Sequence, residues 1–192
     1  RALDHLREGG LVHTRRGVGA FVAQVPTLYP LGPRVRFEQN LRASGRIPAR
    51  HVLLNVTRSA DPREAKALGL PTGAAVHVFE SLGLSDGQPV SLARSVFPAD
   101  VLPGLPAELA ATASITQSLA ACGIHDYTRT WTRVTADLAT ATQAAHLQLN
   151  DPAPVLRTTS LNTDETGRPI EFGRTWFAAE RVTLTLGETP PD

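Results

Sequence analysis

The sequence predicts an α+β fold, in which one antiparallel sheet carries helices on one face. Two observations lead to this prediction. The chain holds two long β-hairpin patterns, each with a glycine-containing turn, at residues 75–97 and 155–177. The turns also repeat, because Gly87-Gln88-Pro89-Val90 recurs 80 residues later as Gly167-Arg168-Pro169-Ile170. We therefore expect two similar halves in one sheet, each made of a strand, a capped helix and a hairpin, with a ligand site between them.

Local signals predict the remaining elements. Start and stop residues indicate helices over 36–44, 61–68, 114–122 and 140–147, and β-rich runs indicate strands over 51–57, 127–136 and 182–186. The helices at Asp61, Ser114 and Thr140 begin with capping-box patterns, because Glu or Gln stands three residues later. Residues 25–33 contain three prolines, which exclude a regular helix and indicate a linker.

Composition excludes several classes of function. The chain has 192 residues, enough for one full domain and part of another, and its net charge of +1 argues against nucleic-acid binding by the whole chain. A single cysteine, Cys122, excludes an intrachain disulfide, and the scattered histidines lack metal-ligand spacing, so we expect neither a metal nor a cofactor. No apolar run reaches the length of a membrane span and no signal peptide is visible, so we expect a cytoplasmic protein without a membrane partner.

Positive charge gathers in residues 1–26, at the tip of a predicted hairpin. Two apolar strands flank the tip, which holds Arg15, Arg16, Gly17 and Gly19. Arginine binds phosphate and glycine lets the backbone approach closely, so such a tip suits contact with a DNA backbone or groove.

This segment resembles the last helix and the wing of the winged helix-turn-helix in GntR-family transcription regulators. The residues that carry the resemblance are Arg1, Ala2, Leu3, Leu6, Gly10, Leu11, Val12, Arg15 or Arg16, Gly17, Gly19, Phe21 and Val22. The resemblance implies operator DNA as a partner, contacted by Arg1, Arg15, Arg16, Gly17 and Gly19. We expect residues 1–26 to be the C-terminal part of a DNA-binding domain whose first helices precede Arg1.

Residues 36–186 resemble the UTRA domain, the effector-binding module of the HutC subfamily of GntR regulators. The matching motifs are F-x-x-x-L-x-x-x-G at 37–45, A-x-x-L-G-L at 65–70, D-G-x-P-V at 86–90 and G-R-P-I-E-F at 167–172. The resemblance implies a chorismate-lyase-like sheet domain, which a linker over 27–35 precedes and a tail over 187–192 follows. A narrower similarity over 29–45, Y-P-L-x-x-x-x-R-F-x-Q-N-L-x-x-x-G, resembles phosphonate-utilisation regulators of the PhnF type.

The resemblance implies a ligand-responsive repressor that binds its operator as a homodimer. Family members commonly hold an anionic effector with an R-x-R pattern, and Ser81 and Gly83 stand at those positions here. We still expect an oxyanion such as phosphate or a phosphonate, because Arg94 and Arg174 occupy matching repeat positions and the helix start at Ser114 offers backbone N–H groups. The alternative for Ser114 is that it only caps its own helix.

The candidate effector-binding residues come from the hairpins and the helix starts. They are Arg36, Ser81, Arg94, Ser95, Ser114, Thr116, Glu171, Arg174 and Phe177. Two further arginines, Arg129 and Arg133, lie in a predicted strand and could also bind an anion, but we favour their interpretation as surface residues at a strand edge.

Two other classes of function stay open at this point. The UTRA fold is similar to that of chorismate lyase, so an enzyme is one alternative, and a module that only binds a ligand or a protein partner is the other. The sequence contains no G-x-S-x-G, P-loop or G-x-G-x-x-G motif. The wing pattern favours a regulator over both alternatives, and we expect no enzymatic activity.

Overall fold

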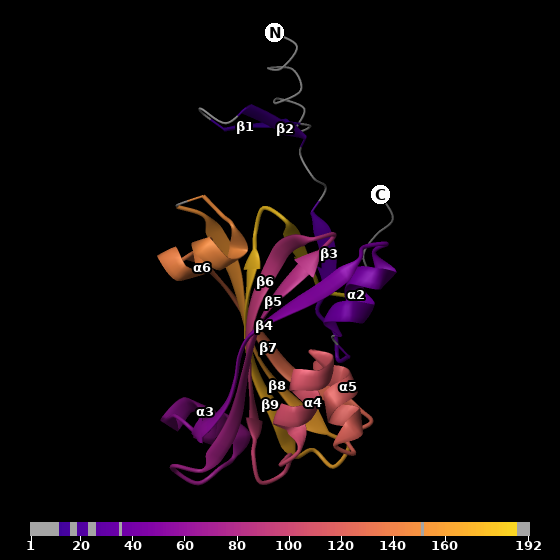
Figure 1. The fold of residues 1–192 in the computed structure, drawn as a ribbon, viewed down its shortest axis with the longest axis vertical. Coiled ribbons are helices and arrows are strands. Elements are labelled where there is room, and N and C mark those ends of the chain that lie inside the picture. Colours follow the sequence, from indigo (N-terminus) through magenta and orange to yellow (C-terminus); the bar gives the residue numbers. More distant parts are fainter. Residues whose placement is uncertain (1–11, 16–18, 23–25, 35, 151, 188–192) are drawn as a thin grey trace.

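The computed structural model describes residues 12–15, 19–22, 26–34, 36–150 and 152–187. Within these ranges a six-stranded antiparallel sheet forms the main body, in the order β4-β5-β6-β9-β8-β7 (Figure 1). Its strands are β4 (Pro48–Ser59), β5 (Ala75–Ser85), β6 (Gln88–Pro98), β7 (Tyr127–Leu138), β8 (Pro154–Asp164) and β9 (Pro169–Ala178). The two halves predicted from the repeat are β4-β5-β6 and β9-β8-β7, and they join where β6 pairs with β9.

Helices lie on both faces of the sheet rather than on the one face expected. α2 (Phe37–Ala43), α4 (Leu105–Thr112) and α5 (Ile115–Ala121) cover one face, and α3 (Pro62–Leu68) and α6 (Ala141–Leu147) lie on the other (Figure 1). Val78 and Phe79 are consecutive residues of β5, so their apolar side chains point to opposite faces of the sheet. Each face therefore needs its own layer of helices. Phe79 packs in the cluster of α4 and α5, and Val78 packs in the cluster that contains Leu68 of α3. In the described part of the chain, no helix is long and apolar enough to cross a membrane.

Side-chain caps begin two of the predicted helices. The carboxylate of Asp61 accepts hydrogen bonds from the N–H groups of Arg63 and Glu64, both at 2.8 Å, and Glu64 accepts one from the Asp61 N–H. Thr140 and Gln143 form the same reciprocal box at the start of α6. These bonds satisfy N–H groups that a helix start leaves without partners, so both predictions are confirmed.

Two features of the α4–α5 region differ from the prediction. α4 was not predicted; its N-cap is Gly104, which offers no side-chain cap, and Pro106 lies in its first turn. The capping box predicted at Ser114 is wrong, because the Ser114 side chain makes no cap hydrogen bond. The Ser114 N–H donates to the hydroxyl of Thr112 at 3.2 Å, and the Ser114 side chain lines a cavity instead.

The segment predicted as a linker contains a strand. β3 (Thr27–Pro30) pairs in parallel with β10 (Val182–Thr185), and the Thr27 N–H donates to the carbonyl of Arg181 at 2.8 Å. Tyr29 and Leu31 are buried in a cluster with Phe177. The prolines do exclude a helix, but a short edge strand tolerates them. The chain therefore packs against the sheet domain from residue 27 onward.

The predicted wing strands are present as an antiparallel hairpin. β1 (Val12–Arg15) pairs with β2 (Gly19–Val22), and Arg15 stands opposite Gly19 at the end of the ladder. Three of the predicted DNA-contacting residues, Arg1, Arg16 and Gly17, lie outside the described residues.

Candidate functional site

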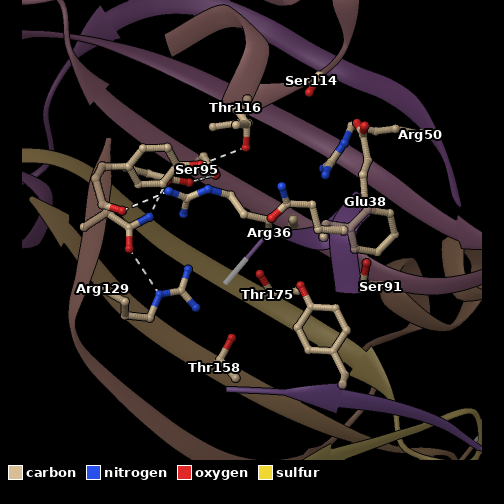
Figure 2. A pocket seen from close by; sticks show the side chains of 18 of the residues that line it. Arg36, Glu38, Arg50, Ser91, Ser95, Ser114, Thr116, Arg129, Thr158 and Thr175 are labelled. Carbon is tan, nitrogen blue, oxygen red and sulfur yellow. Dashed lines mark hydrogen bonds between the residues drawn. The ribbon is translucent and has the colours of Figure 1, made fainter. Parts of the chain in front are cut away.

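A cavity of about 310 Å³ lies on the sheet face that α2 and α5 cover (Figure 2). We call it the central cavity. Its floor consists of small side chains on the central strands, Ser91, Ala93, Ser95, Thr158 and Thr175. Its walls are Tyr29, Leu31, Arg36, Phe37, Glu38, Gln39, Arg50, Ser114, Ile115, Thr116, Gln117, Tyr127, Arg129, Asn162, Glu171 and Phe177. Small-molecule sites have volumes of roughly 300–1,000 Å³, so this cavity suits a small metabolite.

A chain of hydrogen bonds crosses one wall of the central cavity. Arg129 donates from Nε to the side-chain oxygen of Asn162 at 3.1 Å, and the Asn162 amide donates to Glu171 at 2.6 Å. The other carboxylate oxygen of Glu171 accepts from the Ser95 hydroxyl at 2.6 Å. The neutral donors hold the buried carboxylate, so the guanidinium of Arg129 is not neutralised by direct contact with it.

Arg36 enters the cavity from the N-cap position of α2. Its Nη2 donates to the carbonyl of Tyr127 at 2.9 Å, and its guanidinium carbon lies 3.5 Å from the centroid of the Tyr127 ring. One carboxylate oxygen of Asp126 lies 3.8 Å from the same nitrogen. Stacking on the ring and the bond to the carbonyl fix the position of this cation.

Arg50 reaches the cavity from the edge strand β4. Its Nη1 donates to the Ser81 hydroxyl at 2.7 Å, and its guanidinium carbon lies 4.9 Å from the Phe37 ring centroid. Its Nε is buried and has no hydrogen-bond partner among the described residues. Burial lowers the pKa of Arg50, because removal from water disfavours the charged form. An anionic group beside this guanidinium would relieve both costs.

Two tyrosines add neutral donors. Burial raises the pKa of Tyr29 to about 12 and also raises the pKa of Tyr127. Both phenols therefore keep their protons at neutral pH. The Tyr127 hydroxyl lies 3.0 Å from the Thr116 hydroxyl, so these two groups form a hydrogen-bonded pair at the first turn of α5.

The structure brings together most of the residues predicted as effector-binding. Arg36, Ser95, Ser114, Thr116, Glu171 and Phe177 line the central cavity. Ser81 does not line it but holds Arg50, which does.

Arg94 and Arg174 do not lie in the cavity. They are direct partners across β6 and β9, as the repeat predicts, but their side chains point to the opposite face from Ser95 and Thr175. Arg94 forms an ion pair with Glu80, and Arg174 lies over the Phe172 ring. The repeat predicted their symmetry correctly but could not tell which face they occupy.

Sequence reasoning did not select several of the cavity residues, such as Tyr29, Tyr127 and Asn162, and it missed Arg50 and favoured the surface for Arg129. Each of these two arginines precedes a β-bulge in an edge strand, between Val52 and Leu54 in β4 and between Arg129 and Trp131 in β7. A bulge reverses the alternation of side chains, so Arg129 points into the cavity while Arg133 points to the other face. Only an alternation count restricted to the residues before each bulge would have placed both arginines correctly.

Comparison with known proteins supports one family. The UTRA domain family matches residues 43–183. An HTH-type transcriptional regulator of Rhizobium meliloti is 36% identical over 186 residues, which cover 96% of this chain and 76% of the relative. The probable transcriptional regulator PhnF of Escherichia coli is 30% identical over 196 residues, covering 97% of this chain and 77% of that protein.

The crystal structure of PhnF from Mycobacterium smegmatis superposes with a TM-score of 0.78 at 28% identity. The alignment covers 99% of this chain and 83% of that one. These relatives are transcriptional regulators rather than enzymes. Together with the antiparallel sheet of two halves and its central cavity, these matches show that the chain belongs to the UTRA-domain family of transcription regulators.

Proposed function

We propose that the central cavity binds a small oxyanion, a phosphate or a phosphonate, as the effector of a repressor. The observation that carries the proposal is the meeting of Arg36, Arg50 and Arg129 in one cavity, from α2, β4 and β7 (Figure 2). Guanidinium groups bind phosphate-like groups through paired, charge-assisted hydrogen bonds. The unpartnered Nε of Arg50 supports the same reading, since it is buried at the cavity wall.

Arg50 also supplies the cation that the family pattern has elsewhere. The resemblance places R-x-R at Ser81 and Gly83, and neither residue carries charge. Arg50 is the cross-strand partner of Gly83, and its guanidinium bonds to the Ser81 hydroxyl. Arg50 of β4 therefore places a guanidinium beside Ser81 and Gly83 of β5, the two positions that lack the arginines of the family pattern.

Glu171 adds a negatively charged carboxylate to the cavity lining. Ser95 and Asn162 each use one acceptor site of its carboxylate, and a carboxylate offers about four. The remaining sites can accept a hydrogen bond from a hydroxyl or an amine. A phosphonate or phosphate that carries such a group on a short stem would match both the arginines and Glu171.

In this proposal the effector changes DNA binding through β3, the strand that connects the sheet domain to the segment of β1 and β2. Tyr29 and Leu31 lie at the cavity wall on or beside β3, and β3 leads toward the wing hairpin of β1 and β2. A ligand that moves β3 would change the spacing of two winged domains in a homodimer, which a palindromic operator requires. We place this repressor in the cytoplasm, where it would contact operator DNA through Arg15, Arg16 and the neighbouring glycines.

Calorimetric titration of the chain tests the effector class. Inorganic phosphate, methylphosphonate, 2-aminoethylphosphonate and a sugar phosphate are titrated separately. We expect at least one to bind, and Arg129→Ala to weaken that binding by about tenfold or more, in line with loss of one charged contact. Arg133→Ala is the matched control, because Arg133 follows Arg129 on the same strand but points to the opposite face. Binding of a neutral or cationic metabolite, with no heat from any oxyanion at millimolar concentration, would overturn the proposal.

A second measurement tests the DNA contact. In a protein that also carries the first helices of the winged domain, replacing Arg15 and Arg16 by alanine should weaken operator binding and lower the slope of log K against log salt by about 2. The same slope in both proteins would show that the wing does not contact phosphates.

A further inference from the structure

A second concave surface lies on the opposite face of the sheet, between α3 and the outer strands. Its volume is about 760 Å³. We call it the basic groove. It is lined by Arg63, Lys66, Ala67, Trp131, Arg133, Thr135, Arg157, Thr159, Leu161, Phe172, Arg174 and Trp176.

The basic groove is separate from the central cavity although both use β9. Phe172, Arg174 and Trp176 line the groove, whereas Glu171, Thr175 and Phe177 line the cavity. Alternate residues of a strand point to opposite faces, so the sheet itself divides the two sites. A ligand of the groove would therefore be a second ligand, and its binding does not depend on the proposed effector.

Charge in the groove is of one sign. The described residues that line it include five cations and no carboxylate. Arg157 is held in place by Asp137, at 3.2 Å, and by the Thr135 hydroxyl, at 3.1 Å, both from β7. Among the described residues, Arg133 and Arg174 form no ion pair and instead lie over the Trp131 and Phe172 rings, with guanidinium carbons 6.0 Å and 5.4 Å from the centroids. Unlike Arg157, these two guanidinium groups are thus oriented without a paired carboxylate.

Aromatic surface accompanies this charge. The chain has two tryptophans, and both of them, Trp131 and Trp176, line the basic groove. Trp131 is 37% exposed, a large fraction for such an apolar side chain. An indole face stacks on a planar ring, and a guanidinium beside it binds a phosphate group.

We propose that the basic groove binds a nucleotide, a ligand that joins a planar base to two or more phosphate groups. The base would stack on a tryptophan, and the phosphates would contact Arg133 and Arg174 on the sheet and Arg63 and Lys66 on α3. Phosphate alone would satisfy the cations but leave the indoles without a partner, and a nucleoside alone would do the reverse. The groove therefore favours a molecule that carries both chemistries.

Tryptophan fluorescence tests the proposal directly, because both tryptophans of the chain are in the groove. ADP is titrated into the chain at about physiological salt, with adenosine and pyrophosphate titrated separately. We expect ADP to change the fluorescence in a saturable manner and to bind at least about tenfold more tightly than either fragment, since each fragment lacks one set of contacts.

Variants assign the signal to the groove. Arg133→Ala with Arg174→Ala should weaken ADP binding by about tenfold or more, with circular dichroism melting to confirm that the variant is folded. Arg94→Ala, on the same sheet face but outside the groove lining, should leave ADP binding unchanged. In a Trp131→Phe and a Trp176→Phe variant, the residual quenching identifies which indole stacks on the base.

Three outcomes would overturn the proposal. Fluorescence that does not respond to ADP at millimolar concentration excludes a nucleotide site. Equal binding of ADP and pyrophosphate that disappears as salt rises shows only diffuse attraction of anions. Tight binding of a single-stranded oligonucleotide with no response to ADP assigns the groove to a nucleic-acid strand instead of a free nucleotide.

Discussion

The two faces of the sheet use the same strands in different ways. On one face α2, α5 and β3 enclose the central cavity, and each arginine there is fixed by a hydroxyl, an amide, a carbonyl or a ring. On the other face the cations of the basic groove are exposed or half-buried. A site whose side chains are already ordered loses little entropy when it binds. The comparison indicates that selectivity belongs to the cavity and that the groove depends more on charge.

The difference arises from what each helix does for its face. α3 and α6 are seated by reciprocal capping boxes and pack over apolar clusters, so they stabilise the sheet without closing the groove. Arg36, the N-cap residue of α2, makes no side-chain cap hydrogen bond. The first residue of the helix, Phe37, lines the cavity and places its ring close to Gly83. Stability and ligand binding are thus assigned to different helices, and variants can separate them.

The largest expected effect concerns the ion pair between Arg58 of β4 and Glu64 of α3. Glu64 is almost fully buried and accepts two hydrogen bonds from Arg58, both at 2.7 Å. Arg58→Leu leaves that carboxylate buried without its cation, so we expect the free energy of unfolding in urea to fall by about 3 kcal/mol. Effector binding on the opposite face should survive in the folded fraction. Arg63→Leu on the same helix is the control, and an equal loss there would remove the role assigned to the Arg58–Glu64 pair.

The next effect concerns the cover of the cavity. A Cβ added to Gly83 would lie 2.4 Å from the Ser91 hydroxyl and 2.6 Å from the Phe37 ring. Gly83→Ala must therefore shift the Phe37 ring and the Ser91 hydroxyl, and we expect a loss of stability of about 1–3 kcal/mol together with weaker effector binding. Gly173→Ala is the matched control on the same face, because its nearest contact would be 3.1 Å, to the Ser160 hydroxyl. The two variants should differ clearly in urea unfolding, and similar values would show that Phe37 gives way freely.

Sequence reasoning predicted the fold better than the site, for a physical reason. Turn residues, capping boxes and the internal repeat act within a few residues, so α3, α6 and both hairpins were placed correctly. The β3 strand was missed because its only strong partner, β10, is more than 150 residues away in sequence. Arg129 was taken for a surface residue because the bulge after it reverses the alternation and leaves no mark in the sequence.

The third prediction compares arginines on the two faces. Arg50→Lys keeps the charge but removes the Nε donor and the planar fork, so we expect oxyanion affinity to fall by about tenfold, or 1.4 kcal/mol. Arg174→Lys makes the same chemical change on the other face and should leave oxyanion affinity unchanged. Calorimetry on both variants gives the comparison. Equal losses would mean that the oxyanion responds to the overall charge of the domain rather than to the central cavity.

The smallest expected effect is a pH dependence that belongs to neither face. Asp164, in the turn between β8 and β9, accepts hydrogen bonds from the Thr166 hydroxyl at 2.7 Å and from the backbone and side chain of Arg168, each at 3.0 Å. Burial raises its pKa, but these hydrogen bonds outweigh burial, and the net direction is downward. A depressed pKa in the folded state means that the ionised carboxylate stabilises the fold above its unfolded pKa of about 3.9 and that this stability is lost as pH falls through the folded value. Replacing this carboxylate tests the pH dependence. We expect Asp164→Asn to lower the free energy of unfolding by about 1 kcal/mol at pH 7.

The difference in unfolding free energy between Asp164→Asn and the unmodified chain should shrink below about pH 4, as the aspartate of the unmodified chain also becomes neutral. Urea unfolding at a series of pH values measures this, and a constant difference down to the lowest pH would show that the turn is stabilised by shape alone.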